Sequence, residues 1–248
     1  MPKPDLIDAV PAVYRQPAPH EYILRPLSLR RDPAFGGPAE TLEARAAIAA
    51  VTGLVLALER SKKAAESAVS WRDYRVGACA AMVDFEHGLL AYFGGYNVKP
   101  AQAGGLNLHA EQVCLAKGRY NGLNRALGIA ILADPADADA NPHRTPTLCP
   151  CSRCITMFED APEVDERLLI LGANEDLSVC ELYTFGQIRN QGAERELLHP
   201  KPFSLRSEAD LETFDHDIKP QLVMPIYELY GISHPYGYDA SGLPIGHA

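Results

Sequence analysis

The sequence predicts an α/β protein built on a mixed central sheet. Segments with helical and strand-like apolar patterns alternate through the middle of the 248-residue chain, which is typical of layered α/β domains. The first two strand-like segments are joined by a short turn, so they should form an antiparallel hairpin and make the sheet mixed. Hydrophobic residues at 47% and charged residues at 22% are ordinary for a globular protein.

The N-terminal part of the chain is expected to be an arm. Eight prolines fall among the first forty residues, with few periodic apolar stretches between them. Residues 1–40 are therefore interpreted as an extended arm, either loosely ordered or packed on a neighbouring subunit. Residues 40–70 follow as one long helix or two successive helices, because they are rich in Ala, Leu, Glu and Arg, with Gly53 as a possible interruption.

A hairpin and a helix come next. Residues 76–83 and 89–98 are predicted to be strands joined by a turn at 86–88. A loop containing two adjacent glycines leads to a predicted helix over 108–119.

The second half of the core repeats this alternation. Residues 126–132 are predicted to form a strand, and the acidic, proline-containing stretch 134–146 a loop. A helix is expected over 151–158 and a strand over 167–171.

The chain is expected to divide into three parts. Residues 41–190 contain the alternating pattern and are predicted to be a catalytic domain between the arm 1–40 and a C-terminal extension, 191–248. Two Lys-Pro pairs and a Tyr- and His-rich end indicate that this extension lies extended over a surface. Its aromatic residues could close a substrate pocket or pack in a subunit interface.

Three residues have the chemistry of a zinc site. A catalytic zinc typically takes three protein ligands and leaves its fourth position open, and His109, Cys151 and Cys154 meet that requirement. If the Cys-x-x-Cys opens a helix, both sulfurs lie on one face, and the helix N-terminus favours the thiolates that bind metal. Glu111, at the start of the preceding helix, could carry protons near the metal.

Other interpretations of these motifs stay open. A Cys-x-x-Cys can be a redox pair or half of a structural zinc site. Cys149, just before Pro150, could then complete a four-ligand structural or metal-sensing site.

Taken together, the two motifs resemble those of a known enzyme superfamily. His-Ala-Glu at 109–111 followed by Pro-Cys-Ser-Arg-Cys at 150–154 matches the signature of the zinc-dependent nucleobase deaminases. Tyr-Arg-Val-Gly-Ala at 74–78 and Gly-Gly-Tyr-Asn-Val at 94–98 resemble the stretch that precedes the metal motif in cytidine deaminases. The resemblance covers about residues 45–190.

The resemblance implies a fold, a reaction and individual roles. The fold would be the three-layer α/β/α cytidine-deaminase-like fold, with a mixed central sheet and extended terminal arms. The reaction would be hydrolytic deamination by zinc-hydroxide attack, with Zn²⁺ held by His109, Cys151 and Cys154 and Glu111 as the proton shuttle. The backbone N–H of Ala110 would contact the ring carbonyl of the substrate, the carbonyl of Cys149 would receive its amino group, and Asn97 would face the sugar.

The substrate-binding stretch departs from the family pattern. Cytidine deaminases follow the Asn-Val with a glutamate that binds the ribose, whereas this chain has Lys99 and Pro100. Lys99 could bind a phosphate or carboxylate, or be an exposed loop lysine. The substrate is therefore left as a cytidine-like nucleoside or a related aminated heterocycle, whether free base, nucleoside or nucleotide.

Charge and cysteine content limit the partners and compartment. A formal net charge of −9 argues against a polyanionic partner, so a deaminase acting on single-stranded nucleic acid is only an alternative to one acting on a small molecule. Neither a signal peptide nor a membrane-spanning segment is recognisable, and metal-binding thiolates favour the reducing cytoplasm. By analogy with the family, a homodimer or homotetramer is expected.

Overall fold

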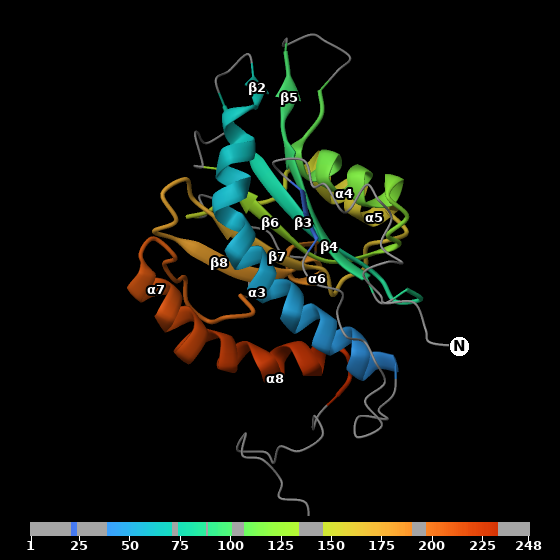
Figure 1. The fold of residues 1–248 in the computed structure, drawn as a ribbon, viewed down its shortest axis with the longest axis vertical. Coiled ribbons are helices and arrows are strands. Elements are labelled where there is room, and N and C mark those ends of the chain that lie inside the picture. The colour runs from blue at the N-terminus through green and yellow to red at the C-terminus, as the bar shows by residue number, and fades with distance from the viewer. Residues whose placement is uncertain are drawn as a thin grey trace, which may run out of the picture.

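The computed structural model describes residues 21–23, 39–70, 74–87, 89–100, 107–133, 146–189 and 197–232 (Figure 1). The predicted N-terminal arm lies outside the described residues, apart from the short strand β1 (Glu21–Ile23) and the start of helix α3 (Ala39–Glu66). The predicted loop over 134–146 also lies outside them, except for its last residue.

A six-stranded sheet forms the centre of the protein. Its strand order is β1-β4-β3-β6-β7-β8. Neighbouring strands are antiparallel except for β6 and β7, which run parallel. The sheet is therefore mixed, as predicted, and its remaining strands are β3 (Gly77–Asp84), β4 (Leu89–Tyr96), β6 (Arg125–Leu132), β7 (Leu169–Ala173) and β8 (Cys180–Thr184).

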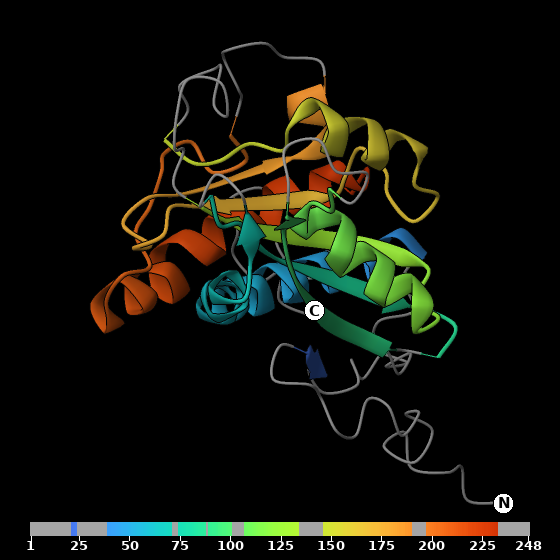
Figure 2. The same cartoon turned by 90° about the horizontal axis from the view of Figure 1, so that it is seen from above.

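Helices cover both faces of this sheet. Strand side chains point alternately to opposite faces, and in β3 this sends Cys79, Ala81 and Val83 into one apolar cluster and Ala78, Ala80 and Met82 into another. The first cluster is completed by α3 and α8 (Lys219–Leu229), and the second by α4 (Ala110–Tyr120) and α5 (Ser152–Asp160), with the short α6 (Phe185–Arg189). Figure 2 shows α4 and α5 on the side of the sheet opposite α3. The three-layer α/β/α prediction is confirmed.

Helix α3 is a single helix that continues through Gly53. The ring of Tyr92 lies directly over this glycine, since a Cβ there would be 1.9 Å from the Tyr92 hydroxyl oxygen. That hydroxyl donates to the carbonyl oxygens of Ala49 and Ala50, at 3.3 and 3.2 Å. Gly53 therefore marks a close contact between helix and sheet and does not interrupt the helix.

The prediction of an extended chain after residue 190 is wrong for residues 208–229. These residues form a nearly continuous helical run through α7 (Glu208–Thr213), the π-helical turn η2 (Phe214–Ile218) and α8. Ser207 and Asp210 begin it with a capping box, in which the backbone N–H of Asp210 donates to the Ser207 hydroxyl at 3.2 Å and the N–H of Ser207 to the Asp210 carboxylate at 3.0 Å.

Packing explains why this run is helical despite its prolines. Every fourth residue from Phe214 points into the apolar cluster under α3, namely Phe214, Ile218, Leu222 and Ile226. The π-helical turn η2 ends two residues before Pro220. The regular α-helical hydrogen bonds are already altered there, so a proline is tolerated. Residues 203–230 thus share a core with α3. The division of the chain into domains stays a prediction.

None of the helices in the described ranges is long and apolar enough to cross a membrane.

Candidate metal centre

The predicted metal ligands lie where two helices begin. His109 immediately precedes α4, and Cys151 immediately precedes α5, with Cys154 in the first turn of α5. His109 (φ −89°, ψ 152°) and Cys151 (φ −70°, ψ 166°) both have extended backbones, as residues at a helix N-cap usually do. The first N–H groups of both helices therefore point toward the same region.

The start of α4 is held against the sheet by backbone contact. Gly95 in β4 permits this, because a Cβ there would lie 2.5 Å from the carbonyl oxygen of Ala110 and 2.8 Å from the backbone nitrogen of Cys114. Lys117 adds a hydrogen bond from its amine to the carbonyl oxygen of Gly94, at 2.8 Å. The Gln112 side chain accepts from the backbone N–H of His109 at 3.0 Å and so fixes the residue that begins the helix.

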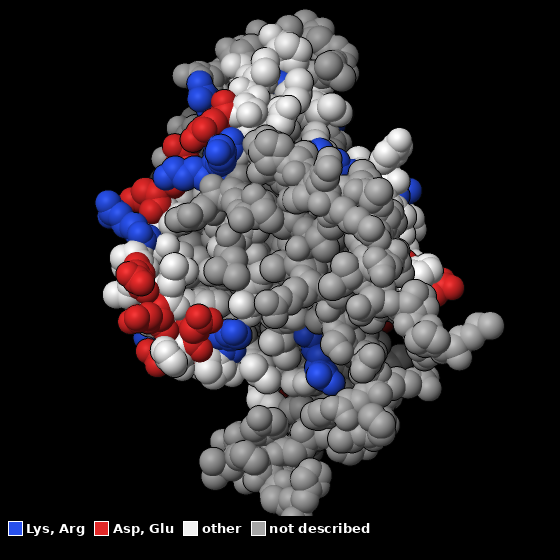
Figure 3. Space-filling model, viewed as in Figure 1, with Lys and Arg blue, Asp and Glu red and all other residues white. Residues whose placement is uncertain are grey.

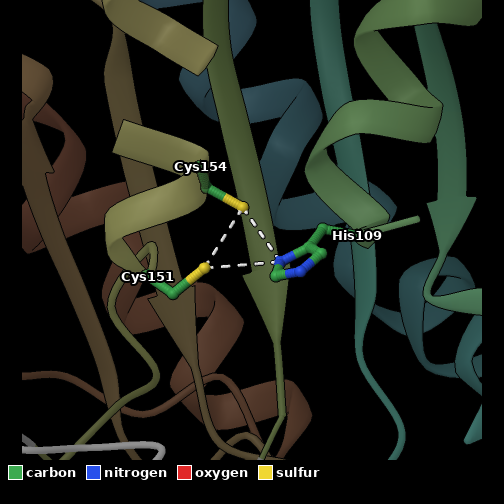
Figure 4. A group of neighbouring side chains, drawn as sticks. All are labelled: His109, Cys151 and Cys154. Atoms are coloured by element: carbon green, nitrogen blue, oxygen red, sulfur yellow. Dashed lines mark hydrogen bonds between the residues drawn. The ribbon is translucent and has the colours of Figure 1, made fainter. Parts of the chain in front are cut away.

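His109, Cys151 and Cys154 form a compact triangle of donor atoms (Figure 4). The Nδ1 atom of His109 lies 3.3 Å from each sulfur, and the two sulfurs lie 3.7 Å apart. Bond lengths of about 2.3 Å to sulfur and 2.0–2.1 Å to nitrogen in a tetrahedron imply donor separations of about 3.8 Å for S–S and 3.6 Å for N–S. The triangle therefore fits an ion of the size of zinc.

The pKa values of the two thiols are shifted in opposite directions. The hydrogen bond with Cys154 lowers the pKa of Cys151 to about 3, helped by a further hydrogen bond with His109. The same sulfur–sulfur hydrogen bond, together with burial, raises the pKa of Cys154. The lowered pKa of the exposed Cys151 favours the thiolate form that binds a cation.

Glu111 is buried beside this triangle. Only 4% of its surface is exposed, and burial raises the pKa of its carboxyl group. Its nearest electrostatic partners are the three proposed ligands, including a hydrogen bond with the Cys154 side chain. A carboxyl group with a raised pKa holds a proton more readily than an exposed one, which suits a group that both takes and gives a proton.

Asn97 holds backbone segments together near the site. Its side-chain oxygen accepts from the N–H of Val76 at 2.9 Å, and its amide donates to the carbonyl oxygen of Tyr74 at 2.9 Å. The side chain is 1% exposed. These bonds give Asn97 a structural role, and its predicted contact with a sugar stays a prediction.

Lys99 lies on a small projection next to the site. Strand β5 (Val98–Lys99) pairs in parallel with β2 (Val69–Ser70), and Val98 forms a bridge with Leu108. This bridge brings the strand of Lys99 beside the residue that precedes His109. The half-buried position of Lys99 is compatible with the predicted contact to an anionic group, which remains a prediction.

Ala110 and Cys149 flank the triangle. Ala110 is fully buried as the first residue of α4, and Cys149 is half-buried two residues before Cys151. Within the part of the chain that the structure describes, the cluster of side chains close enough to share a metal contains His109, Cys151 and Cys154 but not Cys149. This geometry favours three protein ligands over a four-ligand structural site.

Three residues with hydrogen bonds near the site were not predicted. Gln112 follows His109 by three positions, the spacing of a capping box, which was a usable sequence signal. Thr147 and Glu181 form a buried hydrogen bond beneath the segment that leads to Cys151. They are 34 residues apart in sequence, and no local pattern connects them.

Comparison with known proteins gives matches among solved structures. No protein-family model and no curated protein sequence matches the chain. Cytidine deaminase from Burkholderia pseudomallei aligns at 20% identity over 54% of this chain and 91% of its own, with a TM-score of 0.42. The enzyme from Mycobacterium leprae aligns at 18% identity over 54% of this chain and 93% of its own, with a TM-score of 0.37. The enzyme from Mycobacterium tuberculosis aligns at 25% identity over 44% of this chain and 76% of its own, with a TM-score of 0.33. These alignments span about half of the chain. The structure contains the histidine and cysteine group that the motifs predicted.

Proposed function

We propose that this protein is a zinc-dependent hydrolase that releases ammonia from a cytidine-like nucleoside or a related aminated heterocycle. The observation that carries the proposal is the triangle of His109, Cys151 and Cys154 with the buried Glu111 beside it. Three protein ligands leave a tetrahedral ion one open position, which is the arrangement of catalytic and not of structural zinc.

The chemistry divides between the metal and the carboxyl group. A bound zinc ion would lower the pKa of water from about 16 to about 7 and so make a nucleophile available at neutral pH. Glu111 would take one proton from the attacking water and pass it to the ring nitrogen. It would then take the second proton from the hydroxyl now bonded to the carbon and give it to the departing amine. Oxygen bonds to the carbon that carried the amino group, the carbon–nitrogen bond breaks and ammonia leaves.

Residues around the triangle would bind the substrate. The N–H of Ala110 would donate to the ring carbonyl, the carbonyl of Cys149 would accept from the amino group, and Asn97 would border the sugar. Cytidine deaminases have a glutamate at the position of Lys99, and this glutamate binds the hydroxyl groups of the ribose. A lysine there favours a substrate that carries a phosphate or carboxylate instead.

A small molecule suits the charge of the protein better than a nucleic acid does. The net charge is −9, and acidic side chains gather over α7, where Glu208, Asp210 and Glu212 lie (Figure 3). A single-stranded substrate needs a basic groove lined with aromatic residues. We place the enzyme in nucleoside metabolism in the cytoplasm, as a homodimer or homotetramer.

Substitution of Glu111 tests the proposal. Zinc-loaded wild-type protein is incubated with a panel of aminated bases, nucleosides and nucleotides, and ammonia release is measured. Glu111→Gln should retain zinc but lose at least about 100-fold in kcat, because the proton carrier is gone. His109→Ala is the matched variant, which should lose the zinc as well as the activity.

Two results would contradict the proposal. One is deamination by Glu111→Gln at the wild-type rate, which would remove the carboxyl group from the mechanism. The other is a His109→Ala protein that keeps its zinc and its activity, which would place the metal elsewhere.

A further inference from the structure

A buried polar pair lies beneath the segment that leads to Cys151. The hydroxyl of Thr147 donates to a carboxylate oxygen of Glu181 at 2.5 Å. Thr147 is 0% exposed and Glu181 5% exposed. Glu111 and Glu181 are both buried carboxyl groups, and the proposed reaction uses only the first.

The pair connects the segment to the sheet. Glu181 in β8 is the register partner of Gly172 in β7, and a Cβ at residue 172 would lie 2.7 Å from the Thr147 hydroxyl. Thr147 therefore sits directly on this strand pair, at the carboxyl end of β7, where only a glycine leaves room for it. Gly172 plays the same part for this segment as Gly95 plays for α4.

The connection from Thr147 to the ligand is short and constrained. Three residues separate it from Cys151, and two of them, Leu148 and Pro150, are buried. Leu148 packs into the apolar cluster under α4 and α5. A movement of Thr147 away from the sheet would therefore be passed on to Cys149 and Cys151.

The energetics favour a fixed position for this pair. A buried carboxyl group costs stability unless it is hydrogen-bonded, and a hydrogen bond is directional whereas apolar packing is not. The hydrogen bond to Glu181 thus fixes the position of the Thr147 hydroxyl. On the other side of the site, the amide of Gln112 holds His109 in a comparable way.

We propose that Thr147 and Glu181 are positioning residues, which set the Cys151 sulfur and the Cys149 carbonyl at the right distance from His109. The inference rests on the metal centre of the proposed function. Hydrogen-bonded groups behind metal ligands commonly change metal affinity by about 10- to 100-fold when they are removed.

Zinc affinity, measured on the full chain by competition with a chromophoric chelator, tests this role. Thr147→Val keeps the shape of the side chain but removes its hydroxyl, and it should weaken zinc binding by about 10- to 100-fold. Thr147→Ser restores the hydroxyl and should bind zinc within about threefold of wild type. The visible spectrum of the cobalt-loaded protein should change in the valine variant and not in the serine variant.

A double variant separates positioning from folding. Thr147→Val with Glu181→Leu replaces both members of the hydrogen bond by apolar side chains, a change that costs less stability than the loss of one partner alone. Urea unfolding checks that this variant is folded. Positioning predicts that its zinc affinity stays low. Leu222→Ala in α8, on the other face of the sheet, is the control that lowers stability while leaving zinc affinity unchanged.

Each outcome decides the inference. A folded double variant with wild-type zinc affinity would overturn it, as would a loss of affinity in Leu222→Ala equal to that in Thr147→Val. Failure of the wild-type chain to bind zinc would overturn both the inference and the proposed function. Zinc binding that depends on Thr147, in a protein that releases no ammonia from any substrate tested, would support the positioning role and count against the deaminase.

Discussion

The two faces of the central sheet differ in what they bury. The face under α3 and α8 carries a large apolar cluster that includes Leu58, and Ser61 and His199 are buried polar side chains next to it. The face under α4 and α5 has its own apolar cluster, together with the buried carboxyl groups of Glu111 and Glu181. The second face thus buries carboxyl groups, whose removal from water costs stability.

This division explains why the site lies where it does. Both metal-bearing helices begin on the α4 and α5 face. Helix α4 contacts the sheet over Gly95, and the segment before α5 contacts it through Thr147 over Gly172. The apolar face holds the sheet in shape behind them. Substitutions on the two faces should therefore have separable effects on stability and on metal binding.

The largest effect on stability is expected on the apolar face. Leu58 in α3 is 0% exposed, so Leu58→Ala should leave a cavity and lower the free energy of unfolding by about 2–5 kcal/mol. Zinc affinity should not change, because the substitution leaves the metal face intact. Urea unfolding measures the stability, and chelator competition measures the zinc affinity. A loss of zinc affinity by more than about tenfold, or about 1.4 kcal/mol, would show that the two faces are not independent.

Substitution of Gly95 is expected to have a smaller effect on stability but to lower zinc affinity. A methyl group there meets the backbone of α4 and not a flexible side chain, so α4 must move. Gly95→Ala should cost about 1–3 kcal/mol of stability. It should also lower zinc affinity at least about tenfold, through displacement of His109.

Leu58→Ala serves as the control for Gly95→Ala, since it loses at least as much stability on the other face. Equal zinc affinities in the two variants would show that the position of α4 does not govern the metal site.

The smallest effect is expected at an ion pair that belongs to neither site nor core. Burial raises the pKa of Asp165, but hydrogen bonds from Arg167 and Arg125 outweigh it, and the net pKa is lowered. A carboxyl group with a lowered pKa in the folded state stabilises the protein above its unfolded pKa of about 3.9, and this contribution is lost as pH falls through the folded value.

Asp165→Asn should therefore lower stability at neutral pH by about 1 kcal/mol or less, given its partial exposure. The difference between variant and wild type should shrink below about pH 4. Urea unfolding of the metal-free proteins across this range provides the measurement. A difference that is constant with pH would show that the charge of Asp165 contributes nothing.

Strong local patterns made much of the fold predictable. The apolar run of β3 and the Ala-rich composition of α3 predicted both elements to within a few residues of their observed bounds. The Cys-x-x-Cys spacing predicted that the sulfurs of Cys151 and Cys154 lie together, because at a helix start they share one face. His109 was assigned to the same site from its ligand chemistry and from the resemblance to the deaminase signature.

Other features depend on contacts that sequence spacing does not contain. Helix α8 was missed because Pro220 and Pro225 oppose helix formation locally, whereas packing against α3 favours it. The pair of Thr147 and Glu181 forms only after β7 and β8 have paired. Asn97 was assigned to the substrate from a resemblance, and its hydrogen bonds to the backbone become visible only in three dimensions.

The number of sulfur ligands around the bound metal tests the central claim most directly. X-ray absorption at the zinc edge of the loaded wild-type protein should show two sulfurs and two lighter neighbours, since Cys149 lies outside the donor triangle. Cys149→Ser should give the same spectrum. Three sulfur ligands in the wild type, falling to two in Cys149→Ser, would identify a closed structural site and contradict the account.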